Sequence, residues 1–156
     1  MINKVTIMIL VHNAIENVKM SVESIRLFSD IETSLVIVDN HSTDGLNKWA
    51  KEQTDLTYVL FDEGHVSWGK AINMVRCVLQ IGTDLLTMTG NYMLTSGSLS
   101  RMLKLAYKEE NIGAVGGVYN GTGHNQSLNG NESYGNWIFW RENGEYIILM
   151  AVITNH

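Results

Sequence analysis

Four consecutive aliphatic residues, Leu35 to Val38, end abruptly in a carboxylate and a run of turn-forming polar residues, Asp39-Asn40-His41-Ser42-Thr43-Asp44-Gly45. An unbroken apolar run of this kind is typical of a parallel strand that is covered on both faces. Open α/β sheets place their ligands at the carboxyl ends of such strands. We therefore expect Asp39 at the lip of a binding crevice, with the polar residues that follow it leading into the next helix.

The same alternation of apolar runs and polar ends continues along the chain. Apolar runs predict further strands over 4–11, 56–61, 84–89 and 112–119. Apolar residues at helical spacing predict helices over 15–25, 44–53, 67–80 and 99–106. Asn13 is the expected N-cap of the first helix. Alternating strands and helices predict a doubly wound α/β domain with a mostly parallel sheet.

The last part of the chain has a different character. Residues 120–136 are rich in Gly and Asn and predict a long loop, and 137–156 predict two terminal strands. The Asn-Gly pair within Glu142-Asn143-Gly144 is a hairpin signal between these strands. Because no linker divides the chain, we expect a single domain over 1–156, made of a core over 1–119, the loop and the terminal hairpin.

Composition excludes several classes of partner. The net charge is −5, which argues against a broad nucleic-acid or anionic-membrane surface. No apolar run approaches the ~20 residues of a membrane-spanning helix, and the N-terminus lacks the pattern of a signal peptide. No Cys/His cluster has zinc-ligand spacing. These features predict a cytoplasmic protein with no nucleic-acid partner and no membrane span.

Four separated segments combine an apolar run or helix start with characteristic polar residues. They are Val5 to Asn13, Val36 to Gly45, Trp68 to Asn73 and Asp84 to Asn91. Together these segments resemble the family-two glycosyltransferases, whose nucleotide-binding half has the GT-A fold. The resemblance covers residues 4 to about 119 and is most specific in the second segment. It implies a Rossmann-like domain in which residues 1–119 form a nucleotide-binding core.

The resemblance also implies roles for individual residues. The carboxylate in the position of Asp39 hydrogen-bonds the base of a nucleotide-diphospho-sugar, commonly uracil, and His12 and Ser42 lie beside the nucleotide. Asn73 matches an asparagine of the third helix, and Lys70 lies near the position of a basic residue that helps to hold the diphosphate. A carboxylate suits its role because it accepts an N–H from the base edge and rejects bases that lack this donor.

Each of these residues has an ordinary structural interpretation as well. Asp39 and Asp44 are both candidate caps for a neighbouring helix, and for Asp44 the cap is the favoured interpretation. His12 is also explained as a residue that merely ends its strand. Lys70 is also explained as a solvated helix charge, and Asn73 as a tie between helix and loop.

The fourth segment departs from the family pattern. The family's fourth strand ends in a pair of carboxylates, the D-x-D motif, which holds Mg²⁺ or Mn²⁺ against the diphosphate. The corresponding positions here are Thr89, Gly90 and Asn91, and they offer no carboxylate. Because such cations prefer anionic oxygen ligands, we expect Mg²⁺ or Mn²⁺ to bind weakly or not at all. Gly90 and Asn91 are then expected at the diphosphate position without a metal.

The catalytic base is also unassigned. In the family, a carboxylate of the acceptor-binding region deprotonates the acceptor hydroxyl, so that the sugar is transferred with inversion. The acidic residues after the predicted fifth strand match no copy of that motif; they are Glu132, Glu142 and Glu145.

Three functions are compatible with these features. The first is a glycosyltransferase that takes a sugar from a UDP-sugar to an unknown glycan, lipid or protein acceptor, with full or weakened activity. The second is a non-catalytic module that binds nucleotide sugars. The third is a scaffold that forms a homo-oligomer through the aromatic residues between Trp137 and Tyr146.

Overall fold

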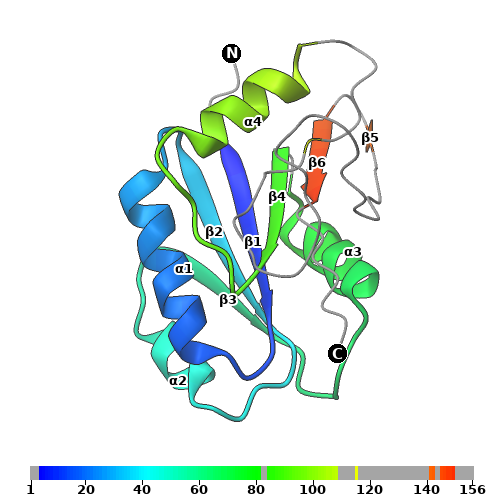
Figure 1. Ribbon diagram of the computed structural model, residues 1–156. Helices are drawn as coiled ribbons and strands as arrows, with labels where there is room; N and C mark the ends of the chain where they lie inside the picture. Colours follow the sequence, from blue (N-terminus) through cyan, green and yellow to red (C-terminus); the bar gives the residue numbers. More distant parts are fainter. Residues whose placement is uncertain (1–3, 82–83, 109–114, 116–140, 143–144, 150–156) are drawn as a thin grey trace, which may run out of the picture.

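The computed structural model describes residues 4–81, 84–108, 115, 141–142 and 145–149 (Figure 1). These residues include a six-stranded sheet with the order β3-β2-β1-β4-β6-β5. Its strands are β1 (Val5–Val11), β2 (Thr33–Asp39), β3 (Leu56–Leu60), β4 (Asp84–Thr89), β5 (Arg141–Glu142) and β6 (Glu145–Leu149). All neighbouring strands pair in parallel except β5 and β6. The predicted α/β fold with a mostly parallel sheet is confirmed.

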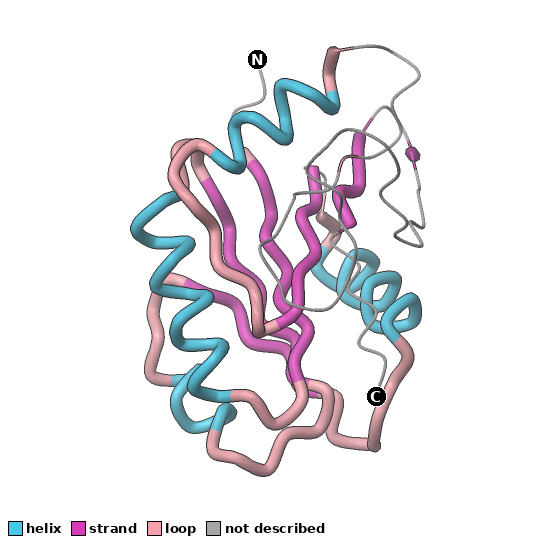
Figure 2. The backbone as a smooth tube through the Cα atoms, viewed as in Figure 1, coloured by secondary structure: helices cyan, strands magenta, loops and turns pink. Residues whose placement is uncertain are grey.

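Helices cover both faces of the sheet. They are α1 (Ile15–Phe28), α2 (Leu46–Lys51), α3 (Trp68–Leu79) and α4 (Ser98–Ala106). Ile7 and Ile9 of β1 share a core cluster with residues of α1, α2 and α4, whereas Met8 and Leu10 pack with residues of α3. Figure 2 shows the resulting three layers, which are those of a doubly wound domain. Of the helices that the structure describes, none has the length and apolarity needed to cross a membrane.

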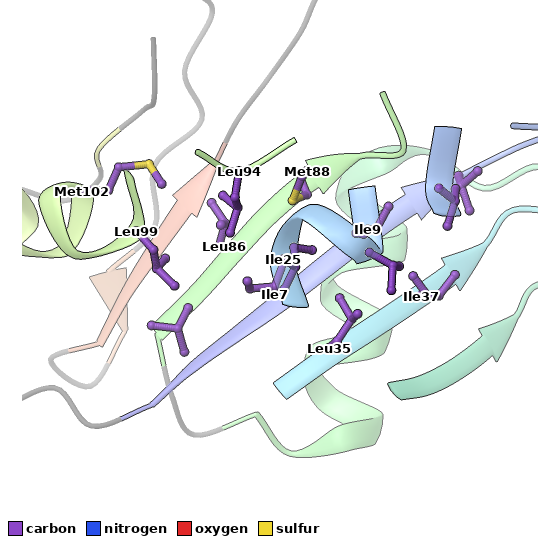
Figure 3. Close-up of a cluster of buried hydrophobic side chains, with 14 of the residues drawn as sticks. Ile7, Ile9, Ile25, Leu35, Ile37, Leu86, Met88, Leu94, Leu99 and Met102 are labelled. Carbon is purple, nitrogen blue, oxygen red and sulfur yellow. The ribbon is translucent and has the colours of Figure 1, made fainter. Parts of the chain in front are cut away.

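The larger core cluster lies between the sheet and the helices α1 and α4 (Figure 3). Ile7, Ile9 and Met88 are fully buried in it, together with Ile25 of α1 and Leu99 of α4. Burying one such side chain stabilises the fold by about 1.5–3 kcal/mol. Because every residue of β1 is buried, the strand requires apolar side chains on both faces, which explains why six of its seven residues are apolar, Thr6 being the exception.

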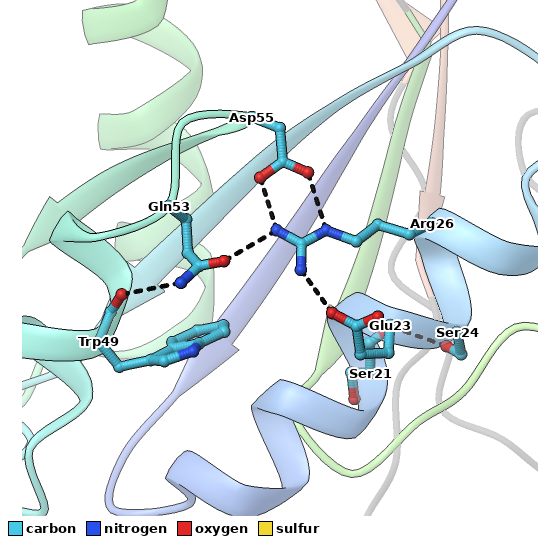
Figure 4. Close-up of polar contacts among 7 residues, drawn as sticks. All are labelled: Ser21, Glu23, Ser24, Arg26, Trp49, Gln53 and Asp55. Carbon is cyan, nitrogen blue, oxygen red and sulfur yellow. Dashed lines mark hydrogen bonds and ion pairs between the residues drawn. The ribbon is translucent and has the colours of Figure 1, made fainter.

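A polar network fastens α1 to the segment between α2 and β3 (Figure 4). The guanidinium of Arg26 donates to both carboxylate oxygens of Asp55, at 2.8 and 2.6 Å, and to the Gln53 side chain at 3.0 Å. It also pairs with Glu23. The Asp55 hydrogen bonds raise the pKa of Arg26, and the same contact lowers the pKa of Asp55. The network therefore holds the amino end of β3 against α1.

The end of the chain adds to the same sheet. β5 and β6 form the predicted hairpin, in which Arg141 lies opposite Tyr146 and Glu142 opposite Glu145. β6 also pairs in parallel with β4, an addition to the sheet that the sequence did not predict. The predicted strand over 112–119, apart from the buried Val115, lies outside the described residues, and so do the loop over 120–136 and residues 137–140.

The order of the strands determines where a ligand can bind. β1 lies between β2 and β4, and the connecting helices change faces at this point, since α1 and α2 lie on one face and α3 on the other. Such a switch point opens a crevice at the carboxyl ends of the strands. The loops after β1, β2 and β3 all lie at the lower edge in Figure 1.

Candidate functional site

The strand register brings most of the predicted site residues to one edge of the sheet. Val11 at the end of β1 lies opposite Asp39 at the end of β2. On the other side of β1, Leu10 lies opposite Thr89 at the end of β4. The segments that follow these strands carry His12, Ser42, Gly90 and Asn91, so the structure gathers these residues along the carboxyl edge.

Asp39 is completely buried, and both of its carboxylate oxygens accept hydrogen bonds. The backbone N–H of Ser42 donates to Oδ1 at 2.7 Å, and the hydroxyl of Tyr58 donates to Oδ2 at 2.6 Å. Burial raises the pKa of Tyr58, and the hydrogen bond to Asp39 and the charges of Asp39 and Asp44 raise it further. The phenol is therefore a neutral donor held against a buried carboxylate.

The loop after β2 is tied to the loop after β1 by reciprocal hydrogen bonds. The N–H of Asn13 donates to the Ser42 hydroxyl at 3.0 Å, and the N–H of Thr43 donates to the Asn13 side-chain oxygen at 2.8 Å. Asn13 has a left-handed backbone conformation (φ 49°) and does not cap α1, so the predicted N-cap was wrong. Its amide is engaged by Thr43 instead.

Asp44 caps both neighbouring helices. Its Oδ2 accepts the N–H of Ile15, the first residue of α1, at 2.8 Å, and its Oδ1 accepts the N–H of Leu46, the first residue of α2, at 3.2 Å. A carboxylate at this position satisfies free N–H groups and the positive helix ends. The favoured interpretation of Asp44 as a cap is confirmed. The predicted helix over 44–53 is shorter in the structure, because Asp44 faces α1 and Gly45 adopts φ 91° before α2 begins.

Two histidine side chains contact each other and Asn40 at this edge of the sheet. The rings of His12 and His65 are 4.1 Å apart between centroids, in an edge-to-face arrangement. The Nδ1 of His12 lies 2.9 Å from the Asn40 carbonyl, so this nitrogen carries the proton. The Asn40 side chain also hydrogen-bonds both backbone groups of Val66. It accepts the Val66 N–H at 2.8 Å and donates to the Val66 carbonyl at 3.0 Å. The buried Asn40 side chain thereby fastens the loop between β3 and α3 to the end of β2.

The end of β4 packs tightly on α1. The hydroxyl of Ser21 donates to the carbonyl of Gly90 at 2.8 Å, and the Asn17 amide donates to Oδ1 of Asn91 at 2.9 Å. A Cβ on Gly90 would lie 2.7 Å from Cγ2 of Val18, so no larger residue fits without a shift. Beside this contact is a small hollow of about 80 Å³, which is lined by Asn17, Met20, Ser21, Gly90, Asn91 and Met93.

These residues do not fit a divalent cation. Thr89, Gly90 and Asn91 supply no carboxylate, and the carbonyl oxygen of the Asn91 side chain already accepts a hydrogen bond. Mg²⁺ and Mn²⁺ require several oxygen ligands, preferably anionic. Among the residues that the structure describes, no group of three or more His, Cys, Asp or Glu side chains could hold a metal ion.

Lys70 and Asn73 lie in the first turns of α3, on the opposite face of the sheet from α1. Both side chains are exposed. Neither makes a hydrogen bond or ion pair with another residue of the described part of the chain. The structure therefore leaves both side chains accessible and joins neither of them to the cluster around Asp39.

Sequence reasoning missed three residues of this edge: Tyr58, Asn40 and His65. Tyr58 lies within an ordinary strand pattern, and only the pairing of Ile37 with Tyr58 places its hydroxyl within reach of Asp39. Asn40 and His65 are separated by 25 positions and meet only because parallel strands end together. The one available sequence signal was the place of Asn40 next to Asp39, just beyond the end of an apolar run.

Comparison with known proteins adds to this geometry. Residues 6–154 match the model of the Glycosyl transferase family 2. Among solved structures, the fold is similar to that of the mannosyltransferase PcManGT from Pyrobaculum calidifontis in complex with GDP-Man and Mn²⁺, with a TM-score of 0.54 and 18% sequence identity. The similarity covers 66% of this chain and 32% of that one, so the chain spans about a third of the length of that enzyme. No curated protein matches the chain.

Proposed function

The chain belongs to the glycosyl transferase family 2, and from this premise we propose that it binds a nucleotide-diphospho-sugar along the carboxyl edge of the sheet. In this proposal the sugar is transferred to a hydroxyl of a glycan, lipid or protein acceptor. The observation that carries the proposal is the interlocked pair of loops after β1 and β2, built around the buried carboxylate of Asp39 at the switch point of the sheet.

The base is assigned to the cluster around Asp39. The carboxylate accepts the ring N–H of uracil, and His12 and Ser42 line the approach to it. The mannosyltransferase with a similar fold was solved with GDP-Man, and guanine offers a ring N–H of the same kind. Cytosine and adenine lack a protonated ring nitrogen at that edge, so a fixed acceptor disfavours them. Uracil is the proposed base, and guanine is the alternative that the binding test must include.

The diphosphate is assigned to the stretch of the edge between α3 and the end of β4. Lys70 supplies a positive point charge and Asn73 supplies an amide donor. Gly90 and Asn91 border the same edge at the end of β4. Since the residues at 89–91 do not fit a cation, the proposed binding of the nucleotide does not depend on a metal held there.

Transfer of the sugar is a single displacement in this proposal. The acceptor oxygen attacks the anomeric carbon, the bond from that carbon to the diphosphate oxygen breaks, and the nucleotide diphosphate leaves. The configuration at the anomeric carbon is inverted, and the hydroxyl proton passes to a base. Holding donor and acceptor in line lowers the entropic cost of this step.

A second candidate is a nucleotide-sugar binding module without transferase activity. The observation that favours it is the end of β4. In the family pattern a metal at this position neutralises the leaving diphosphate. Here the side-chain oxygen of Asn91 already accepts a hydrogen bond from Asn17, and Val18 leaves no room for a side chain at position 90. Binding of a nucleotide sugar is thus better supported than transfer of its sugar.

Calorimetric titration with UDP, GDP and CDP, followed by turnover assays with UDP- and GDP-sugars with and without Mn²⁺, separates these possibilities. The proposal predicts binding of UDP or GDP in preference to CDP, already without Mn²⁺. Sugar release or transfer then identifies a glycosyltransferase, and binding without turnover identifies the module. Absence of binding at millimolar nucleotide contradicts both. Asp39→Asn should weaken binding, whereas Asp62→Asn, an exposed carboxylate of the loop before α3, serves as the matched control.

A further inference from the structure

Tyr58 occupies the hydrogen-bonding position on Asp39 that a nucleobase would need. A carboxylate has about four lone-pair sites. In Asp39 one oxygen accepts the Ser42 N–H and the other accepts the Tyr58 hydroxyl, while the whole residue is 0% exposed. The remaining lone pairs are therefore out of reach from solvent, and a base can contact this carboxylate only if one of the present donors moves away.

The two donors differ in how easily they can move. The Ser42 N–H belongs to the backbone of a loop that is cross-linked to the β1 loop through the Ser42 hydroxyl and Asn13. The Tyr58 hydroxyl sits at the tip of a half-buried side chain on β3, which pairs in the described sheet with β2 only. Rotating a side chain on an edge strand disturbs fewer contacts than opening two interlocked loops.

We propose that Tyr58 is an intramolecular competitor of the nucleobase: its hydroxyl closes the Asp39 carboxylate in the free protein and is displaced when the nucleotide binds. This inference rests on the proposed function, because it takes Asp39 as the base acceptor. Tyr58 is thus a residue that sets affinity and base selectivity. A base without a ring N–H cannot replace the phenol hydrogen bond and does not displace Tyr58, so removal of the hydroxyl should change the binding of such a base less than that of uracil.

The strength of the hydrogen bond from the Tyr58 hydroxyl to the Asp39 carboxylate determines how much the affinity for UDP should change. Its removal in Tyr58→Phe leaves the Oδ2 position vacant and ready for the base N–H, so UDP should bind roughly tenfold more tightly or better. The chain contains a matched control, because the hydroxyl of Tyr107 donates to both oxygens of Asp84 at 2.8 Å, at the opposite end of β4. Tyr107→Phe removes a phenol from another buried aspartate and should leave the affinity for UDP unchanged.

The test is calorimetry of wild type, Tyr58→Phe and Tyr107→Phe with UDP, GDP and CDP. Tighter UDP binding by Tyr58→Phe alone, with CDP binding changed less, supports the inference. Equal or weaker UDP binding by Tyr58→Phe, with wild type still binding UDP, overturns the inference and leaves the proposed function intact. If neither wild type nor Tyr58→Phe binds UDP or GDP, the proposed function fails and the inference fails with it.

A second measurement covers the case in which Tyr58→Phe does not fold. In wild type labelled at the tyrosine ring carbons, saturation with UDP should shift the ring signal of Tyr58 and leave that of Tyr107 in place. A Tyr58 signal that stays unchanged at saturation overturns the inference.

Discussion

The carboxylate of Asp44 accepts the backbone N–H of Ile15 at 2.8 Å and so caps a helix that begins 29 residues earlier in the chain. This contact joins the loop after β2 to the start of α1. Because both loops border the proposed nucleotide site, the cap contributes to the shape of the site as well as to stability.

Replacing Asp44 by Ala should therefore destabilise the fold. The N–H groups of Ile15 and Leu46 lose their acceptor, and the expected loss is about 1–2 kcal/mol in the free energy of unfolding, measured by urea denaturation. Asp62→Ala is the control, since Asp62 is exposed and makes no hydrogen bond or ion pair within the described residues. Equal stabilities of the two variants would show that the Asp44 cap contributes nothing to the free energy of unfolding.

Gly90 and Gly69 provide a matched pair of substitutions. Gly90→Ala would place a Cβ 2.7 Å from Val18 and should cost about 1–3 kcal/mol through overpacking. Gly69→Ala meets nothing within 4 Å inside α3, so it should be neutral or stabilising by up to about 1 kcal/mol. Thermal unfolding of both variants checks the prediction. A Gly90→Ala variant as stable as wild type would mean that α1 yields at this contact.

Asn40 is expected to be the principal anchor of the loop before α3. Asn40→Ala removes both hydrogen bonds to Val66 and the contact with His65, and should reduce stability by about 2–3 kcal/mol. Amide hydrogen exchange over 61–67 should accelerate as well. Asn47→Ala, in α2, should change stability by less than about 0.5 kcal/mol. Unchanged exchange in the loop of Asn40→Ala would refute the anchoring role.

The contact between Arg26 and Asp55 should make stability depend on pH. Arg26 lowers the pKa of Asp55 in the folded protein, so the stabilisation is complete above the ordinary value near 3.8 and is lost as the pH falls through the lower folded pKa. Since the Asp55 side chain is half exposed, solvent screening limits the gain to about 1 kcal/mol. Asp55→Asn should show this loss at neutral pH and little difference from wild type in acid. If the loss of stability in Asp55→Asn persists in acid, it arises from packing and not from the charge of Asp55.

High salt should weaken the same contact, because it is partly open to solvent. Glu63→Gln is the appropriate control, since Glu63 is exposed and forms no ion pair with another described residue. Chemical denaturation by urea at several salt concentrations provides the comparison, and a salt-independent difference between Asp55→Asn and wild type would contradict an ionic origin.

Local sequence patterns predict much of this fold. The adjacent apolar residues within β1, β2 and β4 reflect burial on both faces, and the helical spacing from Trp68 to Leu79 reflects one buried stripe. The alternation of these patterns suffices for the doubly wound order. The parallel pairing of β6 with β4 was not predictable, because no local pattern states which edge of a sheet a terminal strand will join.

The site was less predictable for a related reason. The apolar run that ends in Asp39 indicated its place at the carboxyl edge, but the Tyr58 contact depends on the register between β2 and β3. Likewise Asn13 is a residue type that often caps helices, yet Asp44, which lies in another loop, caps α1 instead. Contacts between segments distant in sequence decide such cases, and propensities describe only neighbours.

The most direct test of nucleotide binding at this edge is a crystal structure of the protein with UDP and Mn²⁺. We expect the uracil ring beside His12, with its ring N–H on the carboxylate of Asp39 and the Tyr58 hydroxyl displaced. We also expect no metal ion held by the Asn91 side chain. UDP bound elsewhere on the protein, or absent from a crystal saturated with it, would contradict nucleotide binding at this edge.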